Sequence, residues 1–408
     1  MTHGLSKGAG RLRGIVIMLV ALGLAWVAFA VTASLGSVRR DPSSALRMWP
    51  GNSLAAAALA DQIVTEAGTV APPPSARGHA LASLGSQPGN PTAARVMGVL
   101  AEFAGDRPGL ARWFAYSERY SRRDLGVQLA QIELAVERGQ IAEALVHYDR
   151  ALRVFAPQPG LIDVLVSASN LADVRQPLVA MLRRNPPWRQ SYLIQLVEGG
   201  RASVDTIYTT LRAIRLDPRQ AFDRRILGEA AGLLVSQQKV ALARTLTGTG
   251  SNGTGTGVRN GGFEQGNPYP PLDWKFTDTV DLSGVVEQGV RDRGGNALFL
   301  YTHNDAAGVV AEQLLSLAPG RYMLSLTSGD SAATAVEAPA TTIGCVGQSA
   351  NLAMLALPTG KDVIRTFRTL VVVPAGCSTQ RLAVAVRPSA EGGTTRPWID
   401  DVAVSRQP

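Results

Sequence analysis

Three ring-bearing side chains, Phe299, Tyr301 and His303, stand at alternate positions in the stretch Ala297–His303, with leucine or threonine between them. The side chains of a strand alternate between its two faces, so the three rings are expected on one face. An exposed aromatic face can stack on the apolar C–H surface of a sugar, while polar neighbours bond its hydroxyls. The same rings could instead pack inside the domain with the leucines outside, and both arrangements stay open.

No set of residues stands out for catalysis. The four histidines, at positions 3, 79, 147 and 303, are scattered, and no pair has the spacing of a helical metal site. There is no Gly-x-Ser-x-Gly motif, and no marked pair of carboxylates such as a glycosidase requires. We therefore expect a protein that is not an enzyme. A glycan-cleaving or glycan-modifying enzyme with an unrecognised site is the alternative.

The chain has only two cysteines, Cys345 and Cys377, both beside predicted strands. In an exported protein such a pair predicts one structural disulfide. Two buried free thiols are the alternative.

The C-terminal third predicts an antiparallel β-sandwich. About eight short, alternating or β-branched runs are bounded by Gly, Pro and Ser, which is the pattern of strands joined by turns. The clearest runs are Ala297–His303, Arg321–Thr327, Thr369–Val373 and Arg381–Arg387.

Short motifs along this region follow one another in a known order. They are Asn260-Gly-Gly-Phe-Glu264, Trp274, Gly295-Asn-Ala-Leu298, Leu317-Ala-Pro-Gly-Arg-Tyr322 and Trp398-Ile-Asp-Asp-Val402. In this order they resemble the jelly roll of carbohydrate-binding module families four and nine, over residues 258–406. The resemblance implies a sandwich and a glycan as a possible ligand. Trp274 and Trp398 stand inside these fold-defining motifs, so we expect core roles for both.

The same resemblance implies that the opening Asn-Gly-Gly-Phe-Glu segment and the closing Ile-Asp-Asp-Val segment lie close together, often beside a calcium ion. It would bring Glu264 and Asp400 to one structural calcium, and carboxylate oxygens are ligands that calcium accepts. Alternatively, the two acids cap strand ends and accept hydrogen bonds from backbone amides.

A helical hairpin is predicted over Asp124–Pro157. Leu125, Leu129, Ile132 and Val136 share one face of a helix, and Gly139 ends the pattern. A second helix follows from Ile141 until Pro157 stops it. Neither helix can bury its apolar stripe alone, so we expect the pair to stack against neighbours.

The second helix of this hairpin resembles a tetratricopeptide repeat through Gly139, Glu143-Ala144, Tyr148 and Ala151-Leu152. The first helix departs from the family, with Gln131-Ile132 in place of Leu-Gly. Further proline-marked helix ends keep roughly the same period, and the resemblance spans residues 41–245. It implies a repeat solenoid that binds a protein partner. An ordinary helical bundle is the alternative.

The N-terminal segment carries no charge from Gly14 to Val38, which is long enough to cross a bilayer as a helix. Basic residues before it and no acids among them favour a cytoplasmic N-terminus. We expect an uncleaved anchor, although Ala28-Phe-Ala30 also fits a signal-peptide cleavage site.

The predicted domains are therefore a cytoplasmic N-terminus (1–13), a transmembrane anchor (14–38), a helical repeat domain (39–245), a linker (246–257) and a β-sandwich (258–408). The Gly- and Thr-rich linker is expected to be flexible and to bury nothing.

The net charge is +8, and nearly all of the positive charges are arginine, since only four residues are lysine. No basic run with interleaved aromatics is present, so we expect no nucleic-acid partner. The sequence predicts a single-pass protein of a bacterial inner membrane with most of its chain in the periplasm. We expect a scaffold or accessory factor in envelope or extracellular polysaccharide synthesis or export, and a pure protein-interaction adaptor is a further alternative.

Overall fold

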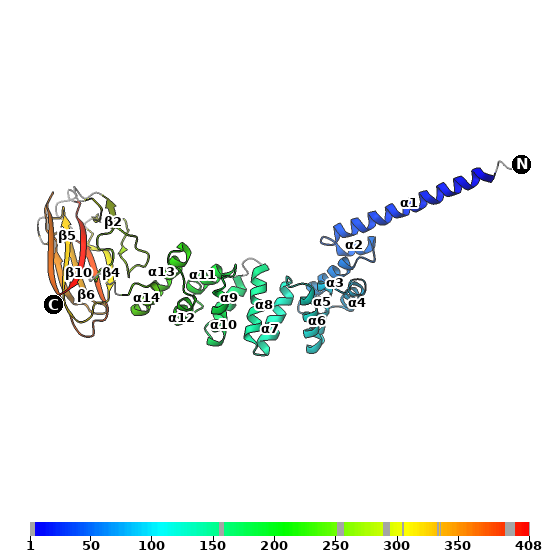
Figure 1. Ribbon diagram of the computed structural model, residues 1–408, viewed down its shortest axis with the longest axis horizontal. Coiled ribbons are helices and arrows are strands. Elements are labelled where there is room, and N and C mark those ends of the chain that lie inside the picture. The colour runs from blue at the N-terminus through cyan, green and yellow to red at the C-terminus, as the bar shows by residue number, and fades with distance from the viewer. Residues whose placement is uncertain are drawn as a thin grey trace. The chain divides into compact units, whose positions relative to one another are not determined.

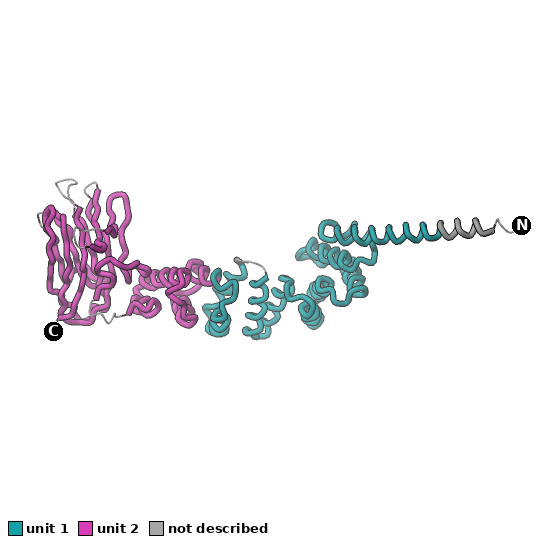
Figure 2. The backbone as a smooth tube through the Cα atoms, turned by 45° about the horizontal axis from the view of Figure 1, so that its top comes forward, with its two compact units in different colours: residues 1–191 teal, residues 192–408 magenta. Residues whose placement is uncertain are grey.

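The computed structural model describes residues 5–154, 159–250, 257–288, 294–303, 306–332, 334, 336–387 and 396–407. The chain divides into two compact units, residues 1–191 and 192–408 (Figure 2). Within the described residues fourteen helices precede ten strands, and the strands form two antiparallel sheets (Figure 1). The predicted order of a helical region followed by a β-sandwich is confirmed.

The first unit begins with α1 (Leu5–Ser37), whose stretch Val16–Ser37 is long and apolar enough to cross a membrane. A signal sequence has the same composition, so the anchor and its orientation stay predictions. The last turns of α1 are packed against the following helices. Ser34 is fully buried, donates to the carbonyl of Ala45 (2.8 Å) and accepts from Asn52 Nδ2 (2.7 Å).

Nine further helices complete the first unit, apart from the start of α11 (Arg189–Glu198). They are α2 (Pro42–Met48), α3 (Ser53–Ala67), α4 (Pro74–Ser86), α5 (Pro91–Phe103), α6 (Arg107–Tyr120), α7 (Leu125–Glu137), α8 (Ile141–Val154), α9 (Pro159–Ala168) and α10 (Ala172–Leu182). An Asp or Asn caps α2, α3, α5, α6 and α7, and each cap side chain accepts a backbone N–H of the first turn. Such a cap stabilises a helix by about 1 kcal/mol.

The predicted hairpin is present as α7 and α8, and Gly139 between them has a φ of +70°. Its predicted end at Pro157 lies outside the described residues. The predicted apolar face of α7 is wrong in part, because Ile132 is buried but Leu129 and Val136 are exposed. The helix instead buries Val127 and Leu134 against α6. Helical pairs are present, but nothing in them establishes the tetratricopeptide character.

Polar side chains tie successive helices together. Arg95 of α5 bonds both Asp61 of α3 and Asp124, the cap of α7 (3.0 Å to Asp124 Oδ2). His147 is buried, with Nδ1 2.9 Å from Gln128 Oε1 and 3.3 Å from Glu118 Oε1.

The second unit holds α12 (Val204–Ile214), α13 (Ala221–Ser236), α14 (Val240–Thr247) and the sandwich. Leu227 and Leu234 of α13 share a buried cluster with Tyr269 and Leu272 of the sandwich. Arg244 of α14 donates to the carbonyl of Leu314 at 2.6 Å.

The predicted linker therefore starts inside a packed region. Thr247 ends α14, and Thr247 and Thr249 are both buried, with their hydroxyls 2.8 Å apart, contrary to the expectation that this segment buries nothing. Residues 251–256 lie outside the described residues, and the domain boundary stays a prediction.

Two five-stranded sheets form the jelly-roll-like sandwich, in the orders β2-β3-β10-β5-β8 and β1-β4-β9-β6-β7. The strands are β1 (Lys275–Phe276), β2 (Leu282–Gln288), β3 (Asn296–Thr302), β4 (Gly308–Leu315), β5 (Gly320–Gly329), β6 (Ala340–Cys345), β7 (Asn351–Ala356), β8 (Ile364–Val373), β9 (Gln380–Val386) and β10 (Trp398–Arg406). A single apolar core, with Phe263 and Trp274 among its largest members, fills the space between the sheets.

The predicted disulfide is present. Cys345 ends β6, and Cys377 lies in the turn before β9 with its Cα 5.5 Å from that of Cys345, within the usual range for a disulfide. Both cysteines are buried in the core of the sandwich.

Candidate functional site

The side chains of strand β3 alternate between the core of the sandwich and the outer face of its sheet. Leu298 and Leu300 point into the core between the sheets, and both are fully buried or nearly so. Phe299 and Tyr301 therefore lie on the outer face of the sheet β2-β3-β10-β5-β8. Of the two arrangements left open by the sequence, the structure has the aromatic residues outside.

The outer face carries one continuous row of directly paired residues. From β2 to β8 the row is Val285, Phe299, Trp398, Gly329 and Ile364. The core role expected for Trp398 is wrong. Trp398 is buried, but its cluster contains Ala297 and Phe299 of this outer face and is separate from the sandwich core, whereas Trp274 does belong to that core. Its indole lies directly over Gly329, where a Cβ would come within 2.4 Å of the ring.

Beside this row, three polar groups form a closed hydrogen-bonded cluster. The Tyr301 hydroxyl donates to Glu287 Oε1 (2.5 Å), and Arg396 donates to Glu287 Oε2 (2.7 Å) and to the Tyr301 hydroxyl (2.6 Å). The guanidinium also lies 5.0 Å from the centre of the Phe299 ring and 5.8 Å from that of Tyr301. We call Glu287, Tyr301 and Arg396 the polar cluster.

The cluster sets the charge states of its members. The hydrogen bond from Tyr301, with Arg396 beside it, holds the pKa of Glu287 below its usual range. Partial burial and the hydrogen bond to ionised Glu287 raise the pKa of Tyr301. At neutral pH the cluster is therefore a carboxylate, a phenol and a guanidinium, an arrangement able to donate to and accept from sugar hydroxyls.

The third predicted residue of this face, His303, lies one position beyond β3 and is exposed. Its backbone N–H donates to the carbonyl of Asp281 at 2.8 Å. No described contact brings its imidazole to the polar cluster. Sequence reasoning missed Glu287 and Arg396, which belong to strand β2 and to the segment that leads into β10.

Asp400 also belongs to the outer face, because it lies two residues beyond Trp398 and pairs with Thr327. Thr327 in turn pairs with Thr366 of β8. This second row places further polar groups next to the aromatic row.

The opening and closing segments of the sandwich do lie together. Val402 N donates to the carbonyl of Gly261 (2.9 Å), and a Cβ at Gly261 would come within 1.9 Å of the Val402 carbonyl oxygen. Glu264 Oε1 accepts from Asn296 N (2.7 Å), and Asp400 Oδ1 accepts from Asp401 N (2.7 Å). Each carboxylate thus accepts a hydrogen bond from a backbone amide, Glu264 from the first residue of β3 and Asp400 from its own neighbour within β10.

Within the described residues, no group of three or more His, Cys, Asp and Glu side chains could hold a metal ion. A calcium ion at Glu264 and Asp400 would therefore need backbone carbonyls or water for the rest of its six to eight oxygen ligands. The calcium site stays a prediction.

No protein-family model and no curated protein matches the chain. Several solved structures resemble part of it. A carbohydrate-binding module of family 4 matches 37% of this chain and 99% of its own, at 19% identity and a TM-score of 0.28. The module TmCBM61, in complex with β-1,4-galactotriose, matches the same shares at 16% identity and a TM-score of 0.28.

A Stig cyclase from Fischerella sp. TAU matches 38% of this chain and 97% of its own, at 14% identity and a TM-score of 0.30. Sugar-binding modules and a cyclase thus resemble the chain to a similar degree. Likeness at this level does not extend to function.

Proposed function

We propose that the outer face of the sheet β2-β3-β10-β5-β8 binds a glycan. The observation that supports this proposal is the polar cluster Glu287–Tyr301–Arg396 beside the buried indole of Trp398. Sugar sites combine apolar surface with a few fixed donors and acceptors. On this face Val285 and Ile364 are exposed apolar residues of the same row, and the polar cluster supplies the donors and acceptors. The chemistry fits neutral or acidic sugars, because Arg396 can also pair with a carboxylate.

The proposed role is binding without catalysis. A glycosidase needs a carboxylic acid whose pKa is raised so that it can protonate the leaving oxygen. The pKa of Glu287 is instead lowered by its hydrogen bond to Tyr301. This carboxylate suits ligand recognition better than proton donation.

The proposed setting is a bacterial envelope. In this proposal α1 anchors the chain in the inner membrane, and the sandwich and helical region lie in the periplasm. The helices form a tetratricopeptide-like surface for a protein partner, to which exposed apolar residues such as Leu129 and Val136 would contribute. The protein would then serve as an accessory factor in polysaccharide synthesis or export.

The test uses the purified full chain and the envelope polysaccharide of the source bacterium, with binding measured by affinity electrophoresis. Arg396→Ala should weaken binding about tenfold, as expected for lost hydrogen bonds from a charged group. Arg381→Ala is a matched control, because Arg381 pairs with Glu312 on the other sheet. Equal binding by both variants would contradict the site. A wild-type chain that binds no glycan but captures membrane proteins would favour the adaptor alternative.

A further inference from the structure

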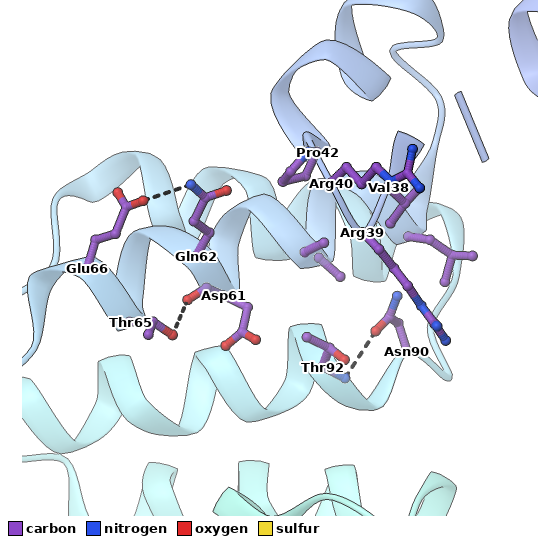
Figure 3. Close-up of a pocket in the computed structure, with 13 residues that line it drawn as sticks. Val38, Arg39, Arg40, Pro42, Asp61, Gln62, Thr65, Glu66, Asn90 and Thr92 are labelled. Atoms are coloured by element: carbon purple, nitrogen blue, oxygen red, sulfur yellow. Dashed lines mark hydrogen bonds between the residues drawn. The ribbon is translucent and has the colours of Figure 1, made fainter. Parts of the chain in front are cut away.

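A second site lies in the first unit, where the chain leaves α1. Val38, Arg39 and Arg40 form one wall of a pocket of about 1020 Å³, and α3 and the start of α5 form the others (Figure 3). The pocket begins one residue after Ser37, the end of the stretch that could cross a membrane. Nothing in the proposed glycan site involves it.

The pocket is lined by the buried polar side chain of Asn90. It is 2% exposed and caps α5, and its Oδ1 accepts from Thr92 N (3.1 Å) and Ala93 N (3.2 Å). Its Nδ2 is buried and has no hydrogen-bond partner in the described part of the chain. A buried amide donor without an acceptor costs about 1–3 kcal/mol, so an acceptor supplied by a ligand would be favoured.

Figure 3 shows the Asn90 amide nitrogen on the side away from Thr92, with the long side chain of Arg39 running beside it. Among the described residues neither the Arg39 nor the Arg40 guanidinium has a protein acceptor. Arg39 and Asn90 Nδ2 are thus two donor groups of one pocket, and the described residues provide neither with an acceptor. The N-terminus of the 13-residue helix α5 adds positive potential at the same point.

Two carboxylates line the pocket, those of Asp61 and Glu66, and neither opposes the binding of an anion beside Arg39. Asp61 is paired with Arg95 of α5, which offsets its negative charge. Glu66 accepts a hydrogen bond from Gln62 (2.7 Å) and lies at the opposite end of the pocket from Arg39 in Figure 3. The end formed by Arg39, Asn90 and the α5 terminus is therefore positive.

We propose that this end of the pocket binds a phosphate group, held by the Arg39 guanidinium and Asn90 Nδ2. Phosphate oxygens accept hydrogen bonds from guanidinium and amide groups, and they match a helix N-terminus. The source could be an anionic phospholipid headgroup or a soluble phosphate compound. The lipid source depends on the proposed membrane placement of α1, which would put the pocket at the level of the headgroups. The phosphate site itself does not depend on that placement.

The experiment uses the full chain in a non-ionic detergent with phosphatidylglycerol added to the micelles, and native mass spectrometry measures retained lipid. Diacylglycerol, which lacks the phosphate, is the matched lipid. Wild-type protein should retain phosphatidylglycerol and not diacylglycerol. Arg39→Ala and Asn90→Asp should each reduce retention about tenfold, as expected for a lost charge-assisted hydrogen bond.

Asn90→Asp is informative because Asp caps helices about as well as Asn, while its carboxylate would repel phosphate. Circular dichroism checks that Asn90→Asp is folded. If Asn90→Asp does not fold, the retention measured for Arg39→Ala decides the test, because Arg39 is exposed and its loss should not affect folding. Arg47→Ala controls for loss of one nearby positive charge, since Arg47 does not line the pocket. Phosphatidylglycerol that the wild type retains and that Arg39→Ala and Asn90→Asp retain equally well would overturn the proposal.

A second arm measures thermal protection by millimolar glycerol 3-phosphate. Protection that both variants lose, without lipid retention, supports a site for soluble phosphate. Retention of phosphatidylglycerol alone supports the lipid headgroup, and no effect in either arm overturns the site. Glycan binding measured on the same samples separates this result from the proposed function, because the two sites share no residue.

Discussion

The guanidinium of Arg396 lies 5.0 Å from the centre of the Phe299 ring and 2.6 Å from the Tyr301 hydroxyl. A cation therefore covers the aromatic surface of β3. A ligand on this face would meet the hydrogen-bonding edges of Arg396, Glu287 and Tyr301 before it met a bare ring. The rings of Phe299 and Trp398 act mainly as the apolar support of that polar surface.

Gly329 is expected to be essential for this support, because a Cβ there would come within 2.4 Å of the Trp398 indole. Gly329→Ala should displace the indole and lower the free energy of unfolding of the sandwich by about 1–3 kcal/mol. Urea denaturation followed by tryptophan fluorescence measures this change. Gly266→Ala is the control, since its Cβ would meet nothing within 4 Å. Equal stability of the two variants would show that Trp398 does not rest on Gly329.

The disulfide between Cys345 and Cys377 should contribute measurably to stability, because it closes a loop of 32 residues. The loop-entropy relation gives about 3.7 kcal/mol for a loop of this length. Denaturation with and without reductant measures the contribution. Intact-mass analysis of protein purified from the envelope should show a gain of about 2 Da on reduction. Two thiols that titrate without reductant would contradict the bridge in the cell.

Glu118 should make the stability of the helical region depend on pH. Burial alone would raise its pKa, but the hydrogen bond and charge of His147, with Arg150, outweigh burial and lower the pKa. A carboxyl group whose folded pKa is lowered stabilises the fold above its unfolded pKa of about 4.3, and this contribution disappears as pH falls through the folded pKa.

Glu118→Gln should therefore cost about 1 kcal/mol at pH 7 and less at pH 3.5. Denaturation at both pH values measures the difference. Glu137→Gln, which removes one partner of an exposed ion pair with Arg107, should change stability little at either pH. A cost for Glu118→Gln that does not vary with pH would be inconsistent with a lowered pKa.

The strands were predictable because they depend on local alternation. All four of the clearest predicted runs coincide with strands, and the hairpin over α7 and α8 follows from the apolar period and Gly139. The buried face of α7 was not predictable from its own stripe. Leu129 and Val136 fit the period as well as Val127 and Leu134 do, and only the position of α6 decides between them.

The polar cluster could not be found in the sequence either. Glu287 and Arg396 are 109 residues apart, and neither belongs to a motif. Their meeting depends on β10 pairing with β3, and on β3 pairing with β2. Pairing of this kind is set by the whole fold, so the sequence indicated the aromatic strand but not the charges around it.

The predicted calcium ion is tested by thermal unfolding of the full chain, followed in the near-ultraviolet region where Trp274 and Trp398 report on the sandwich. A metal that binds only the folded state should raise the melting temperature of this transition. Asp400→Ala should abolish the rise. An unchanged wild-type transition would leave Glu264 and Asp400 as acids that cap backbone amides.

The most direct test of the proposed function is calorimetric titration of the full chain, and of Tyr301→Phe, with the native envelope polysaccharide. The substitution keeps the ring and removes only the hydroxyl that bonds Glu287 and Arg396. Glycan binding at this face predicts a wild-type interaction that Tyr301→Phe weakens about five- to tenfold, with the sandwich still folded. Wild-type protein that releases no heat with the polysaccharide, or a variant that binds as tightly as wild type, would contradict it.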